Sequence, residues 1–113
     1  MQLAMPCGKE NEARAFYSEL LGMKEIPKPP ELQARGGAWF ESGAVRLHIG
    51  AEENFRPARK AHPALACTSY DALVARLEER GVPVTPNENL DNEREHCYIS
   101  DPFGNRIELI SGP

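Results

Sequence analysis

The sequence predicts an α+β protein made of two βαβββ modules that pair as a cupped mixed sheet around a central cleft. Two segments carry apolar residues at the i, i+3, i+4 spacing of an amphipathic helix, and Gly22 or Gly81 follows as a stop signal. A short apolar segment precedes each helix, and three strand-like segments follow it. One helix covers only one face of such a sheet, so two modules are expected to pair and enclose a shared concavity.

The first module is predicted over residues 1–50. Its helix spans residues 9–21, with an apolar face formed by Ala13, Phe16, Tyr17, Leu20 and Leu21. Strands are predicted at residues 2–5, 23–26, 38–41 and 45–49. Loop 27–37 contains three prolines and a Gly-Gly pair, and we expect either a lid or a tolerated surface insertion there.

The second module is predicted over residues 62–113, after a polar linker at residues 51–61 that Pro57 interrupts. Its helix begins in the segment Thr68-Ser69-Tyr70-Asp71, which has N-cap chemistry, and ends at Gly81. Strands are predicted at residues 63–67, 82–85, 95–100 and 106–110. The 113 residues therefore form a single domain with an internal repeat.

Bulk properties restrict the class of function. The net charge of −4 comes from both signs spread along the chain, without a basic stripe for nucleic acid. No apolar run approaches the length of a membrane span, and the start lacks a signal-peptide pattern, so we expect a soluble, cytoplasmic protein. Cys7, Cys67 and Cys97 form no Cys-x-x-Cys pair, which indicates free thiols.

Glu108 is the first candidate functional residue. Because side chains alternate along a strand, Ile107 and Leu109 share the core face and Glu108 faces the cleft. The same alternation in residues 45–49 makes His48 the counterpart of Glu108. Superposing the hairpin glycines would instead place Leu47 there, but this would direct His48 into the core.

Three segments carry a resemblance to a known family. They are Ala13-Arg-Ala-Phe-Tyr-Ser-Glu-Leu-Leu-Gly22, His62-Pro-Ala-Leu-Ala-Cys67 and Asp101-Pro-Phe-Gly-Asn-Arg-Ile-Glu-Leu-Ile110. Together they resemble the first helix, the second opening strand and the closing hairpin of the vicinal oxygen chelate superfamily. That group includes glyoxalase I, extradiol dioxygenases, fosfomycin-modifying enzymes and metal-free bleomycin-resistance proteins. The resemblance covers essentially the whole chain and is more specific for fold than for reaction.

The resemblance implies a set of metal ligands. Metal-binding members use His, Glu or Gln from the first and last strands of each half, which corresponds here to His62 and Glu108. His48 is the third candidate ligand, because the alternation of side chains makes it the counterpart of Glu108. The first-half counterpart of His62 falls one residue before Met1, so either the start is truncated or fewer protein ligands hold the metal; Gln2 is a further candidate with an amide oxygen.

Two imidazoles and a carboxylate suit Zn²⁺, Ni²⁺, Mn²⁺ or Fe²⁺, and open positions would admit a small molecule with two chelating oxygens. We therefore expect a metal-dependent lyase or isomerase of the glyoxalase type, with Glu108 as the catalytic proton acceptor. The expected substrate contacts are Trp39, Arg46, His96, Tyr98 and Arg106. A homodimer is also expected, because the first strand is short and the family commonly dimerises.

Three alternatives remain. With Fe²⁺ the same ligands would suit an extradiol dioxygenase. Ring-cleaving members of the family use further tyrosine and histidine acids besides the metal ligands, and here only His96 and Tyr98 could serve. A metal-free protein could instead sequester an aromatic or cationic drug against Trp39, Phe40, Phe55 and Tyr98. Finally, cationic side chains could recognise a phosphate or carboxylate, namely Arg35, Arg46, Arg56, Arg59, Lys60 and Arg106.

Overall fold

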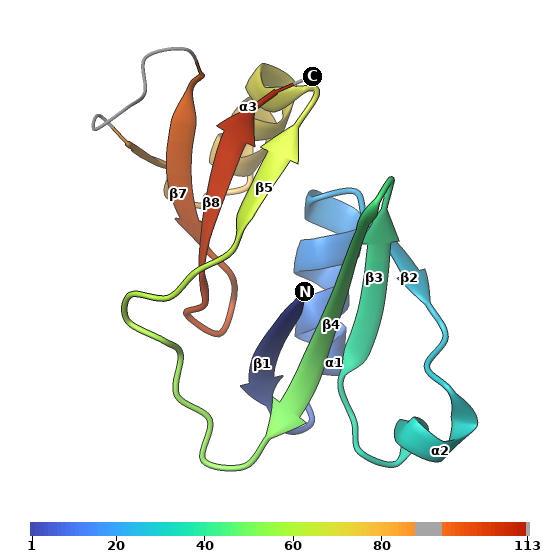
Figure 1. The fold of residues 1–113 in the computed structure, drawn as a ribbon. Coiled ribbons are helices and arrows are strands. Elements are labelled where there is room, and N and C mark those ends of the chain that lie inside the picture. The colour runs from blue at the N-terminus through green and yellow to red at the C-terminus, as the bar shows by residue number, and fades with distance from the viewer. Residues whose placement is uncertain (88–93, 113) are drawn as a thin grey trace. The chain divides into compact units, whose positions relative to one another are not determined.

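The computed structural model describes residues 1–87 and 94–112 and has the predicted α+β class (Figure 1). Two units are distinguished, Met1–Pro57 and Ala58–Pro113. Each unit has its own four-stranded mixed sheet and its own long helical segment. No helix among the described residues is long and apolar enough to cross a membrane.

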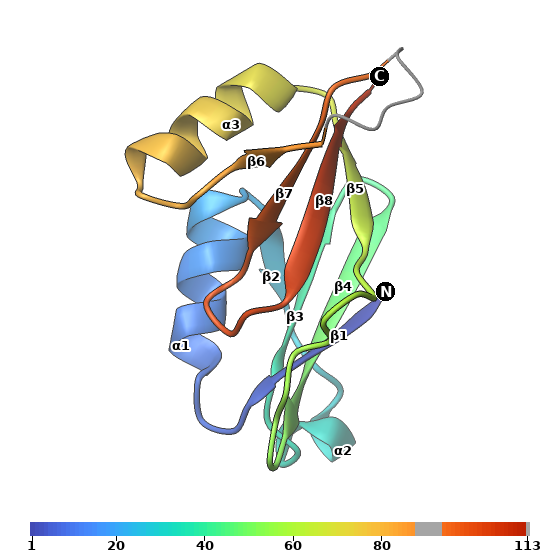
Figure 2. The same ribbon diagram turned by 90° about the vertical axis from the view of Figure 1, so that its left-hand side faces the viewer.

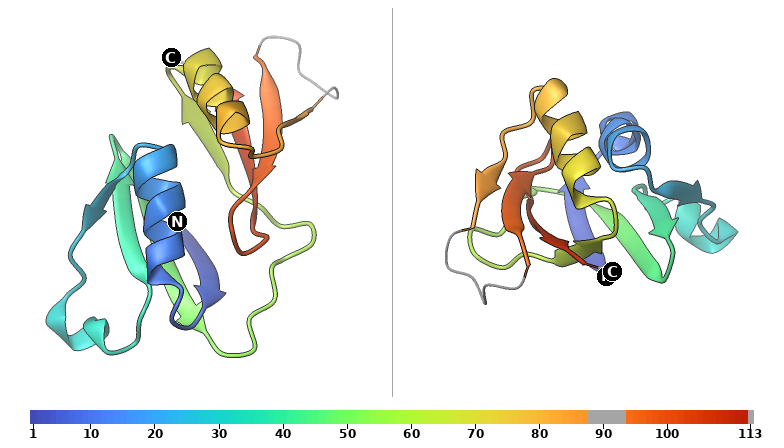
Figure 3. Two further views of the ribbon diagram at one scale, coloured as in Figure 1. Left: turned by 180° about the vertical axis from the view of Figure 1, so that it is seen from behind. Right: turned by 90° about the horizontal axis from the view of Figure 1, so that it is seen from above.

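The first unit contains one sheet in the order β1-β4-β3-β2. Its elements are β1 (Gln2–Pro6), α1 (Glu10–Ala13), the π-helical η1 (Arg14–Leu20), β2 (Lys24–Ile26), α2 (Pro30–Gln33), β3 (Ala38–Ser42) and β4 (Val45–Glu52). Strand β1 is parallel to β4, and the other pairs are antiparallel. The continuous helix α1–η1 lies across one face of this sheet (Figure 3).

Aromatic packing attaches helix α1–η1 to the first sheet. Tyr17 is fully buried, with its ring 5.7 Å from that of Phe40 on β3 and 4.9 Å from that of Phe16. Burying such a side chain contributes about 1.5–3 kcal/mol. The helix ends at Leu20, and Gly22 follows two residues later with a φ of 79°, which favours glycine. The predicted helix at residues 9–21 therefore agrees with the structure to within one residue at each end.

The second unit repeats this plan, with the sheet order β5-β8-β7-β6. Its elements are β5 (Ala64–Cys67), α3 (Tyr70–Glu79), β6 (Thr85–Pro86), β7 (His96–Ser100) and β8 (Arg106–Ser111). Helix α3 lies over one face of the sheet (Figure 2) and buries Leu77 completely. On β8, Ile107 and Leu109 are buried and Glu108 lies on the opposite face, as the alternation predicted.

The registers of the two sheets show that His48 is the structural counterpart of Glu108. Gln2 is opposite His48 in the first sheet, as Ala64 is opposite Glu108 in the second. The His48 amide donates to the Met1 carbonyl at 2.9 Å, and the Glu108 amide donates to the Pro63 carbonyl at the same distance. Leu47 is buried in the core. Parity, rather than superposition of the hairpin glycines, therefore gave the correct alignment of the two halves.

Several boundaries differ from the prediction. Strand β4 continues to Glu52, past the predicted end at residue 49, because β1 pairs with it up to Pro6. Strand β6 contains only two residues, because the Val82 amide still donates to the Leu77 carbonyl of α3 and Pro83 follows. Ser69 precedes α3 but makes no side-chain capping hydrogen bond.

The loop at residues 27–37 is partly ordered as helix α2, which the sequence analysis did not predict. Pro30 occupies the first turn of this helix, where a missing amide hydrogen has no cost. The Lys28 ammonium donates to the Gly36 carbonyl, and the Gly37 amide donates to Glu10 Oε2 at 2.8 Å. The loop is thus tied to itself and to the first residue of α1.

Candidate functional site

The β7–β8 hairpin positions the carboxylate of Glu108, and its turn is built around buried Asp101. Asp101 Oδ1 accepts the amides of Phe103 and Asn105 at 2.9 and 2.8 Å, and Oδ2 accepts Asn105 Nδ2 at 2.8 Å. This closed turn fixes the register in which Tyr98 lies opposite Glu108. The Asp-Pro-Phe-Gly-Asn segment therefore determines which β7 side chains meet Glu108.

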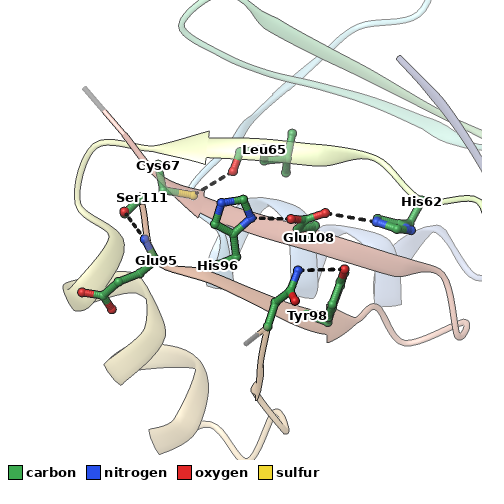
Figure 4. A network of polar contacts seen from close by, with 9 residues as sticks. His62, Leu65, Cys67, Glu95, His96, Tyr98, Glu108 and Ser111 are labelled. Carbon is green, nitrogen blue, oxygen red and sulfur yellow. Dashed lines mark hydrogen bonds and ion pairs between the residues drawn. The ribbon is translucent and has the colours of Figure 1, made fainter. Parts of the chain in front are cut away.

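Two histidines contact the Glu108 carboxylate from either side (Figure 4). His62, in the segment before β5, places Nε2 3.1 Å from Oε1, and His96 on β7 places Nδ1 2.6 Å from Oε2. The side chains are 23% exposed for His62 and 14% for His96 and Glu108. At this burial the contacts are protected from much of the solvent screening that weakens surface ion pairs.

The protonation of His62 follows from its second contact. Its Nδ1 lies 2.8 Å from the Lys60 carbonyl oxygen. A carbonyl only accepts, so Nδ1 carries a hydrogen, and a neutral His62 directs the Nε2 lone pair at the Glu108 carboxylate. Two acceptors in contact need a proton or a metal cation. A histidine that donates one ring N–H to a backbone carbonyl while the other nitrogen binds metal is a recurrent arrangement.

The separation of these two atoms also fits a divalent metal ion. Two ligands about 2.1 Å from one ion, at about 90–110°, are roughly 3.0–3.4 Å apart, and the observed separation is 3.1 Å. Among residues 1–87 and 94–112, however, no three His, Cys, Asp or Glu side chains form a group that could hold a metal ion. The second unit therefore supplies two candidate metal ligands, His62 Nε2 and Glu108 Oε1, while His96 contacts the other carboxylate oxygen.

The two histidines also change the acidity of Glu108. The hydrogen bond from His96 is the largest influence and holds the pKa of Glu108 below its usual range, although burial acts in the opposite direction; a hydrogen bond from His62, which forms when Nε2 also carries a proton, lowers the pKa further. Glu108 is therefore ionised at neutral pH. This state suits a metal ligand and a hydrogen-bond acceptor, and a lowered pKa makes the carboxylate a weaker base.

Tyr98 is at the centre of a second group of contacts on the same face. Its hydroxyl accepts Asn87 Nδ2 at 3.0 Å, and its ring lies 5.3 Å from that of His62 in an edge-to-face arrangement. The guanidinium carbon of Arg106 lies 3.9 Å from the ring centroid. Five predicted site residues of the second half are thus brought together: His62, His96, Tyr98, Arg106 and Glu108.

The remaining predicted site residues belong to the first unit. Trp39 and His48 are opposite each other on β3 and β4, with ring centroids 3.7 Å apart and planes within 4°. Burial, followed by the N-terminal ammonium and Arg46, lowers the pKa of His48, so its imidazole is neutral at pH 7. Arg46 is exposed. Phe40 is fully buried in the core, so it is not available as a surface for a ligand.

Sequence reasoning missed the contact between His96 and Glu108. His96 is opposite Ile110, and its imidazole therefore reaches Glu108 diagonally across the strand pair. Alternation placed both side chains on one face, but their contact depends on the hairpin register. The role of Asn87 was also missed, since nothing in its neighbourhood along the chain indicates a hydrogen bond to Tyr98.

Comparison with known proteins identifies the family. Residues 2–109 match the family described as the Glyoxalase/Bleomycin resistance protein/Dioxygenase superfamily. A search of curated proteins found no match. The crystal structure of a protein from Bacillus anthracis assigned to the glyoxalase family is 47% identical, with a TM-score of 0.94, over 99% of this chain and 91% of that one.

More distant structures share the fold but differ in their described functions. A lactoylglutathione lyase from Agrobacterium tumefaciens is 23% identical with a TM-score of 0.72, over 99% of this chain and 92% of that one. TnmS3, an antibiotic binding protein from Streptomyces sp. CB03234, is 24% identical with a TM-score of 0.71, over 99% of this chain and 93% of that one. These two likenesses support the fold alone.

Proposed function

The chain belongs to the Glyoxalase/Bleomycin resistance protein/Dioxygenase superfamily, and we propose that it is a divalent-metal-dependent lyase or isomerase. Its substrate is a small molecule that presents two neighbouring oxygens. The observation that supports this proposal is the opposition of His62 Nε2 and Glu108 Oε1 at 3.1 Å, with Nδ1 of the same imidazole on a carbonyl. A protein that only encloses a ligand has no need of this arrangement.

In this proposal His62 and Glu108 hold the ion, which when bound polarises a substrate carbonyl and makes the adjacent C–H more acidic. The Lys60 carbonyl fixes the ring orientation of His62. His96 keeps the second oxygen of Glu108 in place through its 2.6 Å contact. Glu108 is ionised at neutral pH and is the proposed acceptor of the substrate proton. Because its lowered pKa makes Glu108 a weak base, it can remove this proton only when the metal has made the C–H more acidic.

Metal analysis of protein purified without added metal tests the ligand pair. We expect one equivalent of a divalent metal in the wild type and less than a tenth of that in His62→Ala and Glu108→Ala. Glu79→Ala, which removes an exposed carboxylate at the end of α3, is the matched control and should retain the metal. A metal-free wild type that also takes up none of Zn²⁺, Ni²⁺, Mn²⁺ or Fe²⁺ on titration contradicts the proposal.

His48→Ala belongs in the same experiment because the internal repeat gives His48 the position of Glu108. We propose His48 as a further ligand on this equivalence. Loss of the metal from His48→Ala would support that role. Unchanged metal content would assign His48 to the aromatic pair with Trp39 alone.

The alternative function is metal-free sequestration of an aromatic or cationic small molecule. The parallel rings of Trp39 and His48, 3.7 Å apart, favour this candidate because a flat aromatic pair is a surface on which a planar ligand can stack. Quenching of Trp39 fluorescence by an aromatic drug in metal-free protein, lost in His48→Ala, would support it. Oxygen uptake with a catechol after anaerobic loading with Fe²⁺ would instead indicate an extradiol dioxygenase.

We also propose that the protein forms a homodimer in the cytoplasm. Strand β1 is at an edge of the first sheet, and edge strands offer backbone groups for pairing. Sedimentation equilibrium should give twice the mass of the chain. A monomer at all concentrations would contradict this proposal without affecting the metal assignment.

A further inference from the structure

Arg106 is a half-buried cation of the second unit that has no anionic partner among the described residues. It lies on β8 two residues before Glu108, on the same face, and is only half-buried. Within residues 1–87 and 94–112 its side chain makes neither an ion pair nor a hydrogen bond. Its described contact is with the ring face of Tyr98, at 3.9 Å from the guanidinium carbon to the centroid.

This contact holds the guanidinium in a defined place. Arginine stacked on an aromatic face keeps the N–H groups at the edge of its planar guanidinium available to bind a carboxylate or phosphonate with two parallel hydrogen bonds. Tyr98 is itself fixed by Asn87 at its hydroxyl and by His62 at its ring (Figure 4 shows Tyr98 beside Glu108). An anion that binds there meets a donor whose position is already determined, which reduces the entropic cost of binding.

The equivalent arginine of the first unit lacks these features. In the β3–β4 hairpin Arg46 is opposite Glu41. In the matching β7–β8 hairpin Arg106 is opposite Ser100. Arg46 is exposed and has a carboxylate across the strand pair, whereas Arg106 is half-buried and faces a serine there. The environment of Arg106 therefore belongs to the second unit and is not a consequence of the shared topology.

We propose that Arg106, held against Tyr98, binds an oxyanion of the substrate. His62 and Glu108 hold the metal ion that the two chelating oxygens at the other end of the substrate bind. Residues two apart on one strand face are separated by about 6.6 Å, so both ends fit one small molecule. The substrate class is thus an anionic oxygen chelator, with a carboxylate or a phosphonate as the distal group. The part of the proposal that concerns the chelating end rests on the proposed metal site.

A matched pair of probes tests the distal group by isothermal titration calorimetry on zinc-loaded protein. Acetohydroxamate offers two chelating oxygens alone, and the monohydroxamate of succinic acid adds a carboxylate. We expect the wild type to bind the carboxylate probe about tenfold more tightly at low salt, from one charge-assisted contact. Arg106→Gln should lose this preference and keep its affinity for acetohydroxamate. A hydroxamate with a phosphonate arm shows which oxyanion is favoured.

Three variants separate recognition from general effects of charge and folding. Arg80→Gln removes an exposed positive charge at the end of α3 and should leave the preference unchanged. Arg106→Lys keeps the charge without the planar fork, so part of the preference should remain. Tyr98→Phe keeps the ring face and should retain most of it. Circular dichroism and thermal unfolding confirm that each variant is folded.

Equal affinity of the wild type for both hydroxamates, or a preference that persists in Arg106→Gln, overturns the inference. Failure of the wild type to bind either hydroxamate, together with no uptake of metal, overturns the proposed function instead. In that case titration of succinate into metal-free protein decides the inference. Weaker binding by Arg106→Gln than by the wild type supports it, and equal or absent binding by both contradicts it.

Discussion

At the scale of single residues, Glu10 joins the start of α1 to the loop that carries α2. The Gly37 amide, which donates to Glu10 Oε2 at 2.8 Å, is the main cause that holds the pKa of Glu10 below its usual value of 4.5. A carboxyl whose pKa is lower in the folded state stabilises the fold above its unfolded pKa. This contribution disappears as the pH falls through the folded pKa.

Glu10→Gln should therefore destabilise the protein by about 1 kcal/mol at pH 7, because the charged acceptor is replaced by a neutral one. The difference from the wild type should shrink as the pH falls through the folded pKa of Glu10, which lies below 4.5. Urea unfolding at pH 7 and pH 3 measures both values. Glu12→Gln is the control, since Glu12 belongs to the same first turn and its carboxylate makes an exposed ion pair with Lys9. An equal loss at both pH values would contradict this account.

Asp101 is a second residue whose side chain supports several others. In Asp101→Asn an amide NH₂ replaces one carboxylate oxygen and meets Asn105 Nδ2, so two donors face each other. We expect a loss of about 1–3 kcal/mol in the free energy of unfolding. The double variant Asp101→Asn with Asn105→Asp restores a donor–acceptor pair and should recover part of the loss. Additive effects of the two changes would argue against this pairing.

At the scale of elements, the junction between the α2 loop and β3 depends on a glycine. Gly37 has a φ of 87°, and a Cβ there would lie 2.2 Å from the Ile49 carbonyl oxygen of β4. Gly37→Ala should therefore destabilise the first sheet by at least about 3 kcal/mol, since backbone must move. Gly43→Ala is the comparison, because its φ of 56° is also positive but nothing lies within 4 Å of the added atom. Gly43→Ala should lower the free energy of unfolding by about 1 kcal/mol. Denaturant titration of both variants measures the two losses.

The same elements show how far sequence reasoning reaches. Alternation identified the faces of β4 and β8, because buried Leu47, Ile107 and Leu109 exclude the opposite choice. It could not determine that His96 contacts Glu108, because this depends on a register that the Asp101 turn sets. Helix α2 was missed because a four-residue helix leaves no apolar periodicity. The tautomer of His62 likewise depends on the Lys60 carbonyl, which no pattern of side chains indicates.

At the scale of the whole molecule, one topology is used twice with different side chains on equivalent positions. The position of Glu108 is occupied by His48 in the first unit, and that of Tyr98 by Trp39. In the second unit the Glu108 carboxylate lies between His62 and His96. In the first unit the rings of His48 and Trp39 stack in parallel. The repeat therefore conserves the backbone while the two faces differ in chemistry.

This difference leads to a prediction for the unfolding of the whole chain. A metal that binds the folded protein stabilises it by about 2.7 kcal/mol at one hundred times its dissociation constant. Saturating Zn²⁺ should therefore raise the thermal midpoint by several degrees, and a chelator should reverse the change. Amide exchange should slow in β8, which carries Glu108, and in β5, which follows His62 and pairs with β8. His62→Ala should show neither effect, and a zinc response that survives this substitution would place the metal elsewhere.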